Sequence, residues 1–372
     1  MEVLGRIPGR PGLWRLVWSG GGIASLSCSD PAFRDTACDW ITPGLYDLQI
    51  NGIAGISFSN PLVSVKDLGK ADARIRDKGV SRYLATIITC GREAAATVVQ
   101  TFEEARRAGV LRAGAGIHLE GPWISPEEGF RGVHRLEHVR DPDPRELSAL
   151  QARAGGWVRL VTVAPERPGA ESLIRAAVSS GIAVSLGHTN AGAEDVQAAI
   201  RAGATLSTHL FNGCVRQIDR HRNVIFSQLA ADELSACFIA DSHHVPLSTL
   251  RIGLRAKGLD RSILVSDIAP LSGLADGEYE MEGNPVEIRD GGIFVKGSYL
   301  LSGAARTLDQ DVEILGREAE PGIESALLMA TRNPARAMGD ADWAELHEGR
   351  GQAVAVFSWD GSRLRLKHRL GF

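Results

Sequence analysis

The sequence is 372 residues long, is 44% hydrophobic and carries a formal net charge of −4. This length suits one large domain with a smaller one, and the slight acidity offers no basic footprint for nucleic acid. No stretch has the length and apolarity of a membrane span, and the N-terminal segment lacks the apolar core of a signal peptide, so we expect a cytoplasmic protein. The five cysteines include no Cys-x-x-Cys pair, which indicates reduced thiols and argues against cysteine as a metal ligand.

Both ends of the chain are predicted to form β-strands. The segment LWRLVW from residue 13 is followed by three glycines at 20–22, and the strands QAVAVFSW and RLRL near the C-terminus flank an Asp360-Gly361 turn. Neither end alone buries much apolar surface. We therefore expect residues 1–42 and 337–372 to meet in one small β-sandwich domain.

Between these ends, from 43 to 336, strands alternate with helices. The predicted helices include Ala71–Lys78, Glu93–Ala108, Glu171–Ser180, Ala193–Ala202 and Leu247–Lys257. The predicted strands are Gly44–Ile50, Tyr83–Ile88, Ala113–Leu119, Val158–Val163, Ala183–Leu186, Leu206–Thr208, Ala236–Ala240 and Ile263–Val265. Eight strands in this alternation predict a (β/α)8 TIM-type barrel. A doubly wound sheet is the alternative, but no Gly-x-Gly-x-x-Gly turn or Walker-type loop supports it.

The segment AGAGIHLEGPWISPEEGFRGVH, residues 113–134, contains a short apolar strand that stops at a carboxylate. Because side chains alternate along a strand, His118 and Glu120 fall on the same face. A single buried carboxylate could be a structural ion pair, so Glu120 alone does not identify a site.

Polar side chains recur where the predicted strands end. They are Gln49 and Asn51 after the first strand, Glu120 after the third, His188 after the fifth, His209 after the sixth, His243 and His244 after the seventh, and Asp267 after the eighth. The carboxyl ends of barrel strands converge on one mouth, where such folds place their chemistry. Two imidazoles with a carboxylate can hold a divalent metal and leave a position for water.

Several motifs resemble those of the N-acetylglucosamine-6-phosphate deacetylase family within the amidohydrolase superfamily. They are PGLYDLQINGIAG, HLEGPWISPEEGFRGVH, SLGHTNA, STHLFNG, IADSHHV, LVSD and LLSGA, and they occur in order along most of the chain. The resemblance implies a metal-dependent barrel, a small β-domain built from both termini and a homodimer. It also implies hydrolysis of the acetamide of N-acetylglucosamine-6-phosphate to glucosamine-6-phosphate and acetate.

Carried over motif by motif, the resemblance implies that Glu120, His188 and His209 bind the metal and that Asp267 is the proton-transferring base. It also implies that His244 polarises the acetamide oxygen. Where the family has Gly in Asp-Gly-x-His, this chain has Ser242, so His243 is the alternative to His244.

Many amidohydrolases have His-x-His after the first strand and hold two metals, whereas this chain has Gln49-Ile50-Asn51. Amides are poor ligands for transition metals, so we expect one ion, with Gln49, Asn51 and His118 as neighbours of its ligands. Zn²⁺ suits the ligand set, and Fe²⁺ or Mn²⁺ are alternatives.

The resemblance is weaker where it concerns the substrate. It implies contacts from Asn212 and Gly213, from Arg220 or Arg222 reaching across a dimer, and from Gly132 and His134. The chain departs from the family pattern at Gly213-Cys214 and beyond. An alternative substrate is therefore an N-acyl amino acid or an unphosphorylated N-acetyl sugar. A non-catalytic binding module is a third possibility, against which the retained ligand set and Asp267 argue.

Overall fold

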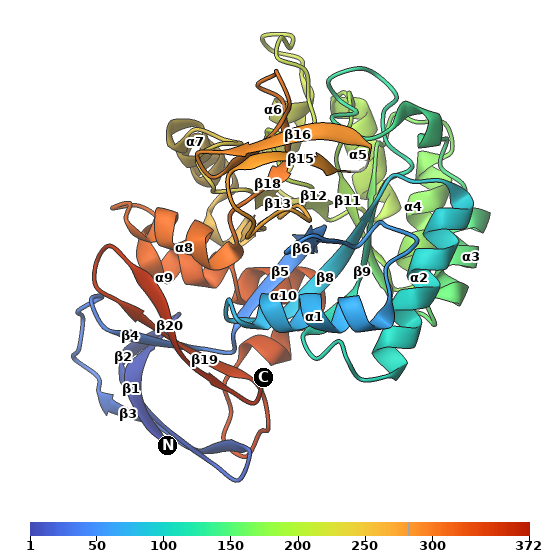
Figure 1. The fold of residues 1–372 in the computed structure, drawn as a ribbon. Coiled ribbons are helices and arrows are strands. Elements are labelled where there is room, and N and C mark those ends of the chain that lie inside the picture. Colours follow the sequence, from blue (N-terminus) through green and yellow to red (C-terminus); the bar gives the residue numbers. More distant parts are fainter. Residues whose placement is uncertain (282) are drawn as a thin grey trace.

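Eight parallel strands form the centre of the structure, a computed structural model that describes residues 1–281 and 283–372 (Figure 1). In spatial order the sheet runs β14-β13-β12-β11-β10-β9-β8-β5. Its strands are β5 (Leu45–Ile50), β8 (Val80–Ile88), β9 (Gly114–Glu120), β10 (Val158–Val163), β11 (Ala183–Leu186), β12 (Leu206–Ser207), β13 (Ser235–Phe238) and β14 (Ser262–Leu264). The sheet closes where Asp267 N donates to Gln49 O at 3.0 Å and Asn51 N donates to Ile268 O at 2.9 Å. The predicted (β/α)8 barrel is confirmed.

Helices cover the outside of this barrel (Figure 1). They are α1 (Val65–Arg76), α2 (Arg92–Arg107), α3 (Pro144–Arg153), α4 (Ala170–Ser179), α5 (Ala193–Ala202), α6 (Val224–Leu229), α7 (Leu247–Lys257), α8 (Leu308–Gly316), α9 (Gly322–Met329) and α10 (Arg332–Ala337), with short 3-10 turns at Leu136–His138, Leu259–Arg261 and Ala341–Ala344. The first helix begins six residues before the predicted Ala71, because Ser64 Oγ accepts from Asp67 N at 3.2 Å and caps it there. No helix in the described residues is long and apolar enough to cross a membrane.

The two ends of the chain share one six-stranded sheet, in the order β20-β19-β4-β1-β2-β3. Its strands are β1 (Glu2–Ile7), β2 (Arg10–Ser19), β3 (Gly22–Asp30), β4 (Asp39–Thr42), β19 (Val354–Trp359) and β20 (Leu364–Leu370). Val3, Leu16 and Ile23 from the first strands pack with Val354 and Val356 from the last hairpin in a common core. This packing explains why neither end needs to bury its apolar face alone, and the predicted union of the termini is confirmed.

A further antiparallel sheet, which the sequence reasoning missed, lies over the barrel mouth (Figure 1). It consists of β15 (Gly277–Met281), β16 (Asn284–Arg289), β17 (Gly292–Val295) and β18 (Leu301–Ala304), and a small hairpin, β6 (Gly52–Ile53) with β7 (Ile56–Ser57), follows β5. Val286, Ile288 and Ile293 of the sheet pack on Ala269 and Leu271 just after β14. This sheet supplies one wall above the polar strand ends.

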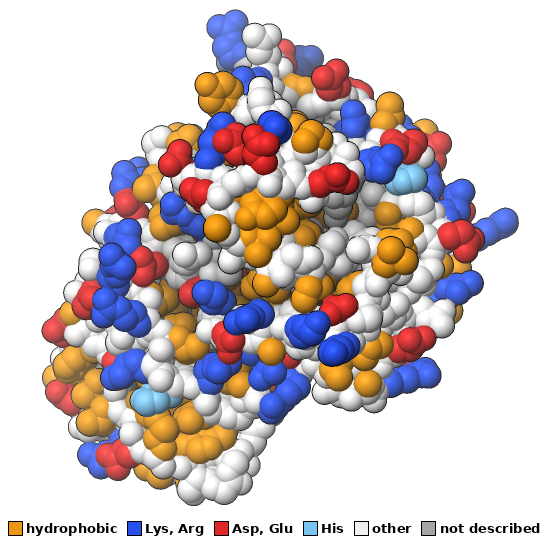
Figure 2. All heavy atoms as spheres, in the orientation of Figure 1, with side chains coloured by type: hydrophobic (Ala, Val, Ile, Leu, Met, Phe, Trp, Pro, Cys, Tyr) orange, Lys and Arg blue, Asp and Glu red, His pale blue; other side chains and the backbone are white. Residues whose placement is uncertain are grey.

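Charged side chains of both signs are interspersed over the face drawn in Figure 2, as the near-balanced composition predicts. Hydrophobic side chains gather at the centre of the same face, below the β15–β18 sheet (Figure 2).

Candidate active site

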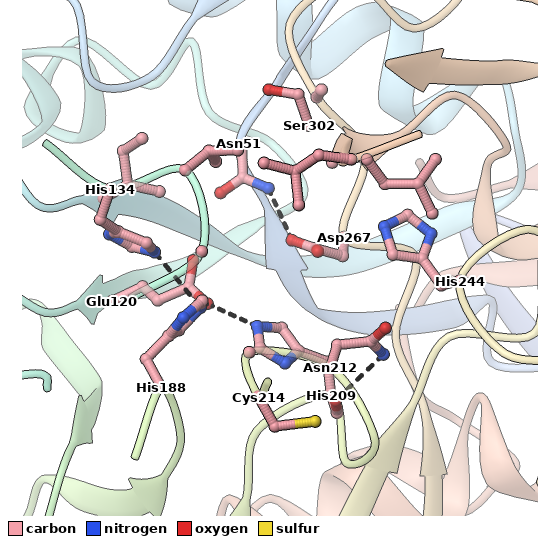
Figure 3. A pocket seen from close by; sticks show the side chains of 18 of the residues that line it. Asn51, Glu120, His134, His188, His209, Asn212, Cys214, His244, Asp267 and Ser302 are labelled. Atoms are coloured by element: carbon pink, nitrogen blue, oxygen red, sulfur yellow. Dashed lines mark hydrogen bonds and ion pairs between the residues drawn. The ribbon is translucent and has the colours of Figure 1, made fainter. Parts of the chain in front are cut away.

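Glu120, His188 and His209 converge at the barrel mouth from the ends of β9, β11 and β12 (Figure 3). Glu120 Oε1 lies 2.9 Å from His209 Nε2 and 3.3 Å from His188 Nε2. All three are buried, and both histidines have positive φ, 49° at His188 and 25° at His209. Non-glycine residues rarely adopt this conformation, and those that do cluster at functional sites. Burial opposes ionisation of Glu120, but hydrogen bonds from the two imidazoles outweigh it and hold its pKa well below the ordinary value.

His134, expected to contact a sugar, lies beside these ligands. Its Nε2 is 3.2 Å from His188 Nε2, and its Nδ1 is 2.8 Å from Thr89 Oγ1. Glu120, His134 and His188 offer ligand atoms that all lie within 4.8 Å of one another. Burial, then the neighbouring His188, lowers the pKa of His134 to about 3, so its imidazole is neutral. A divalent cation would suit this concentration of imidazole nitrogens around one carboxylate.

Asp267 follows β14 and is tied to the same cluster by two amides. Its Oδ1 accepts from Gln49 Nε2 at 2.9 Å and from Asn51 Nδ2 at 2.8 Å, and Gln49 Nε2 also donates to Glu120 Oε1 at 2.9 Å. Burial, followed by the charge of Glu120, raises the pKa of Asp267. A carboxyl group with a raised pKa can both accept and return a proton near neutral pH.

His244 enters the pocket and His243 does not. Asp241 Oδ2 lies 2.7 Å from His244 Nδ1, and Asp241 Oδ1 accepts from His243 N at 2.8 Å and His244 N at 2.9 Å. Burial opposes ionisation of Asp241, but the hydrogen bond with His244 outweighs this effect and lowers the pKa of Asp241 to about 2. His243 instead packs near Gly291 and Gly292 at the β16–β17 turn. Sequence reasoning missed Asp241, although its place three residues before His244 was a usable signal.

His118 lies in the barrel interior, on the same strand as Glu120. Its Nδ1 is 3.3 Å from Thr86 Oγ1 and its Nε2 is 2.8 Å from Thr162 Oγ1. Burial lowers the pKa of His118 to about 4, so it is neutral there. His118, Thr86 and Thr162 therefore form a hydrogen-bonded group inside the barrel.

These side chains line a pocket of about 330 Å³. Asn212, Gly213 and Cys214 line it on one side, as does Gly132, and Asn212 Nδ2 donates to His209 O at 3.1 Å. Arg216 is the only Lys or Arg among the described residues that line this pocket. Arg220 and Arg222 are exposed on the following loop and do not line the pocket.

Comparison with known proteins identifies the family to which this chain belongs. The model of the Amidohydrolase family matches residues 40–350. An N-acetylglucosamine-6-phosphate deacetylase of Bos taurus is 35% identical over 321 residues, which cover 82% of this chain and 76% of that protein. The chain belongs to the N-acetylglucosamine-6-phosphate deacetylase family, within the amidohydrolases.

Two further members of the family bear on this deacetylase-type site. An N-acetylgalactosamine-6-phosphate deacetylase of Shewanella sp. strain ANA-3 is 32% identical over 345 residues, 92% of this chain and 84% of that protein. A variant of the N-acetyl-D-glucosamine-6-phosphate deacetylase of Mycobacterium smegmatis, solved in complex with N-acetyl-D-glucosamine-6-phosphate, superposes with a TM-score of 0.86 at 28% identity. That comparison covers 97% of this chain and 96% of the other.

Proposed function

We propose that this protein hydrolyses the acetamide of N-acetylglucosamine-6-phosphate to glucosamine-6-phosphate and acetate. The observation that carries this proposal is the meeting of Glu120, His188, His209 and Asp267 in one pocket of a chain of this family. Amide hydrolysis needs an activated water molecule, a proton carrier and a polarised carbonyl, and the pocket offers groups suited to each.

We propose that Glu120, His188 and His209 hold one divalent ion, Zn²⁺, with Fe²⁺ and Mn²⁺ as the alternatives. The donor set supports this, because the Nε2 atoms of His188 and His209 both face a single carboxylate oxygen of Glu120. The amide nitrogens of Gln49 and Asn51 donate to Asp267, and amide oxygens are poor ligands for a transition metal, which argues against a second ion. When bound, the ion supplies Lewis acidity that activates water and polarises the amide carbonyl.

The protein's own groups then divide the proton transfers. Both amide contacts to Asp267 end on Oδ1, so Oδ2 is left to take a proton from the attacking water and return it to the leaving amine nitrogen. The carboxylate of Asp241 orients His244 through Nδ1, so Nε2 can donate to the carbonyl oxygen as negative charge develops there. His134, at the edge of the cluster, binds the sugar in this proposal.

For the phosphate we propose contacts from Asn212, from the backbone at Gly213 and from Arg216. Arg216 carries the pocket's one guanidinium, and in the described part of the chain it has no hydrogen-bond or ion-pair partner. A guanidinium suits a planar fork on phosphate. Arg220 or Arg222 adds a further contact from the second subunit of a homodimer.

A hydrolysis screen tests the proposed activity. The purified protein is assayed with N-acetylglucosamine and N-acetylgalactosamine, each with and without 6-phosphate, and with N-acyl amino acids. We expect release of acetate from N-acetylglucosamine-6-phosphate to be fastest. The Shewanella relative motivates the galactosamine arm, and the altered residues after Asn212 motivate the amino-acid arm. Faster hydrolysis of an unphosphorylated sugar or an N-acyl amino acid would contradict the proposal.

We also propose a cytoplasmic location and a division into domains of 1–42 with 337–372 and of 43–336. The shared terminal sheet supports this division, because Val3, Leu16 and Val356 pack in a core of their own, while Trp40 and Phe357 of the same sheet pack against the barrel core.

A further inference from the structure

A second cleft, here called the side cleft, opens beside the catalytic pocket and has a volume of about 570 Å³. Ser59, Pro61, Ala94 and Leu271 line it and do not line the catalytic pocket. The two spaces share the lining residues Ile88, Val133, Pro270, Met281 and Asn284. The side cleft therefore adjoins the catalytic pocket, and nothing in the proposed deacetylation of an acetyl sugar uses it.

The side cleft lies across the mouth from the proposed phosphate contacts. Its lining comes from the segments after β5 and β8, together with the start of α2 and the β15–β16 hairpin. Asn212 and Arg216 instead follow β12. In sheet order β8 is the second barrel strand and β12 is the sixth, so the two regions lie on opposite sides of the closed barrel. Glu120, His209 and Asp267 line the catalytic pocket that adjoins the side cleft, and Asn212 lies next to His209 (Figure 3).

The geometry of the amide decides which part of a substrate faces the side cleft. A secondary amide prefers the trans form, which directs its acyl chain and its nitrogen substituent to opposite sides of the C–N bond. If the carbonyl sits at Asp267 and the sugar extends toward Asn212 and Arg216, the acyl chain points away from them. That direction leads past Ile88 and Pro270 to the side cleft.

We infer that the side cleft receives the acyl chain of the substrate, so that this enzyme hydrolyses glucosamine-6-phosphates whose N-acyl groups are longer than acetyl. The inference rests on the proposed function and extends its substrate class. The reaction is unchanged: water forms the new bond to the acyl carbon, the C–N bond breaks, and the proton goes to the amine nitrogen. The acyl chain leaves as a carboxylate.

The lining favours an aliphatic chain over a charged one near the reacting carbonyl. Ile88, Val133 and Pro270 lie at the boundary that the two spaces share, and Ala94 and Leu271 line the side cleft alone. The charged side chains Arg135 and Glu280 line the side cleft without lining the catalytic pocket. Burying each added methylene against such a lining contributes favourably to transition-state binding, by up to a few-fold in rate constant.

The test is a series of glucosamine-6-phosphates bearing N-acetyl, N-propanoyl, N-butanoyl and N-hexanoyl groups, assayed by release of the free amine. For the wild-type enzyme we expect kcat/KM for the longer acyl groups to fall no more than about tenfold below the acetyl value anywhere in the series. A closed methyl pocket would instead reduce kcat/KM by more than a hundredfold at butanoyl, and that result overturns the inference. Absence of hydrolysis of the acetyl compound would reject the proposed function instead.

A variant that fills the side cleft gives a second, independent measurement. Ala94→Phe places a ring in the cleft from the first turn of α2, away from the catalytic side chains. We expect it to lower kcat/KM for the hexanoyl compound at least tenfold and to leave the acetyl compound within about twofold. Gln100→Phe, on the exposed side of the same helix, is the matched control and should change neither.

Ala94→Leu, a smaller change, covers the case in which the phenylalanine variant folds poorly, because activity on the acetyl compound reports the folded fraction in each protein. Equal loss of both substrates in a variant with normal thermal unfolding would contradict the assignment of the acyl chain to the side cleft.

Discussion

Two overlapping sets of side chains at the barrel mouth could hold the ion, and they differ in one histidine. Glu120 and His188 belong to both, and the third ligand is His209 in our proposal or His134 in the more compact grouping. We predict that His209→Ala loses bound metal, because a three-ligand site has no redundancy, whereas His134→Ala retains it. Metal content of the purified variants, measured by mass spectrometry, separates the two sets.

Glu120→Gln and His188→Ala are the controls for that comparison, since both sets predict loss of metal in these variants. Full metal content in His209→Ala with loss in His134→Ala would reverse the assignment of the third ligand.

Asp267→Asn should keep the metal and lose turnover. The asparagine oxygen can still accept from Gln49 and Asn51, so the local structure is preserved, but the side chain can no longer carry a proton. We predict a fall in kcat by a factor on the order of a hundred or more. Metal content and kcat are measured on the same preparation. A variant with near-normal kcat would place the base elsewhere, and His244 would be tested next.

Arg216→Ala should discriminate between phosphorylated and plain substrates. Losing a charge-assisted partner is expected to weaken transition-state binding of N-acetylglucosamine-6-phosphate by about 2–4 kcal/mol, which lowers kcat/KM for this substrate. The unphosphorylated sugar should be almost unaffected, because it has no phosphate to pair with Arg216, whereas general damage to the barrel would reduce hydrolysis of both substrates. Arg216→Lys is expected to restore only part of the loss, since an ammonium lacks the planar fork. Equal effects on both substrates would contradict the proposal that Arg216 contacts the phosphate.

At the residue scale, the sequence predicted the strand-end groups because their positions follow from the fold. Glu120 is the last residue of β9, and His188, His209 and Asp267 lie two or three residues after the ends of their strands; the barrel brings all such positions together. Arg216 could not be found in this way. Counting residues from His209 assumes a known loop path, and the loop 212–223 brings Arg216 into the pocket lining and leaves Arg220 and Arg222 outside it.

At the element scale, buried parallel strands were easier to predict than the sheet over the mouth. Barrel strands such as Val158–Val163 are nearly continuous apolar runs, whereas Gly277–Met281 mixes half-buried and exposed residues along its length. The sequence nevertheless contains one signal for the sheet over the mouth, at the turn between β16 and β17. Asp290 and Gly291 have φ of 51° and 76°, the conformation of a two-residue hairpin turn, and an Asp-Gly pair between apolar strands predicts this turn.

Helix α8 carries a buried acid whose titration should affect stability. Asp311 is fully buried, and neither carboxylate oxygen has a hydrogen-bond partner in the described residues. Burial, followed by the charges of Asp241 and Asp47, raises its pKa well above the ordinary value. Because the folded pKa exceeds the unfolded one, unfolding releases a proton from about pH 4 upward, and the free energy of unfolding falls as pH rises.

Asp311→Asn removes that proton release, so we predict higher stability for the variant and a larger gain at pH 8 than at pH 5. A gain of about 1 kcal/mol at pH 8 is expected, since one pKa unit corresponds to roughly 1.4 kcal/mol. Urea unfolding at the two pH values measures it. A destabilised variant, or a gain that does not grow with pH, would show that Asp311 is ionised in the folded protein.

At the scale of the whole molecule, the chain crosses between the terminal sheet and the barrel twice. β4 leads into β5 through Pro43 and Gly44, and β19 returns to pair antiparallel with β4, from Ala355↔Thr42 to Ser358↔Asp39. Arg6 in β1 also donates to Glu324 in α9 at 2.7 Å. These contacts attach the terminal sheet to the side of the molecule away from the mouth (Figure 1), so this sheet does not cover the pocket face.

Arg220 and Arg222 do not line their own pocket, so a role in substrate binding requires a neighbouring subunit. We predict a homodimer, and complementation between variants tests the shared site. A chain carrying Arg220→Ala and Arg222→Ala, co-expressed with an Asp267→Asn chain under a different affinity tag, should form mixed dimers with one complete site. Half of randomly paired dimers are mixed, so about a quarter of wild-type activity is expected. Light scattering establishes the oligomeric state, and each variant alone provides the baseline. A dimer without recovered activity would confine phosphate binding to Arg216 and its own loop, whereas a fully active monomer would reject both the dimer and the shared site.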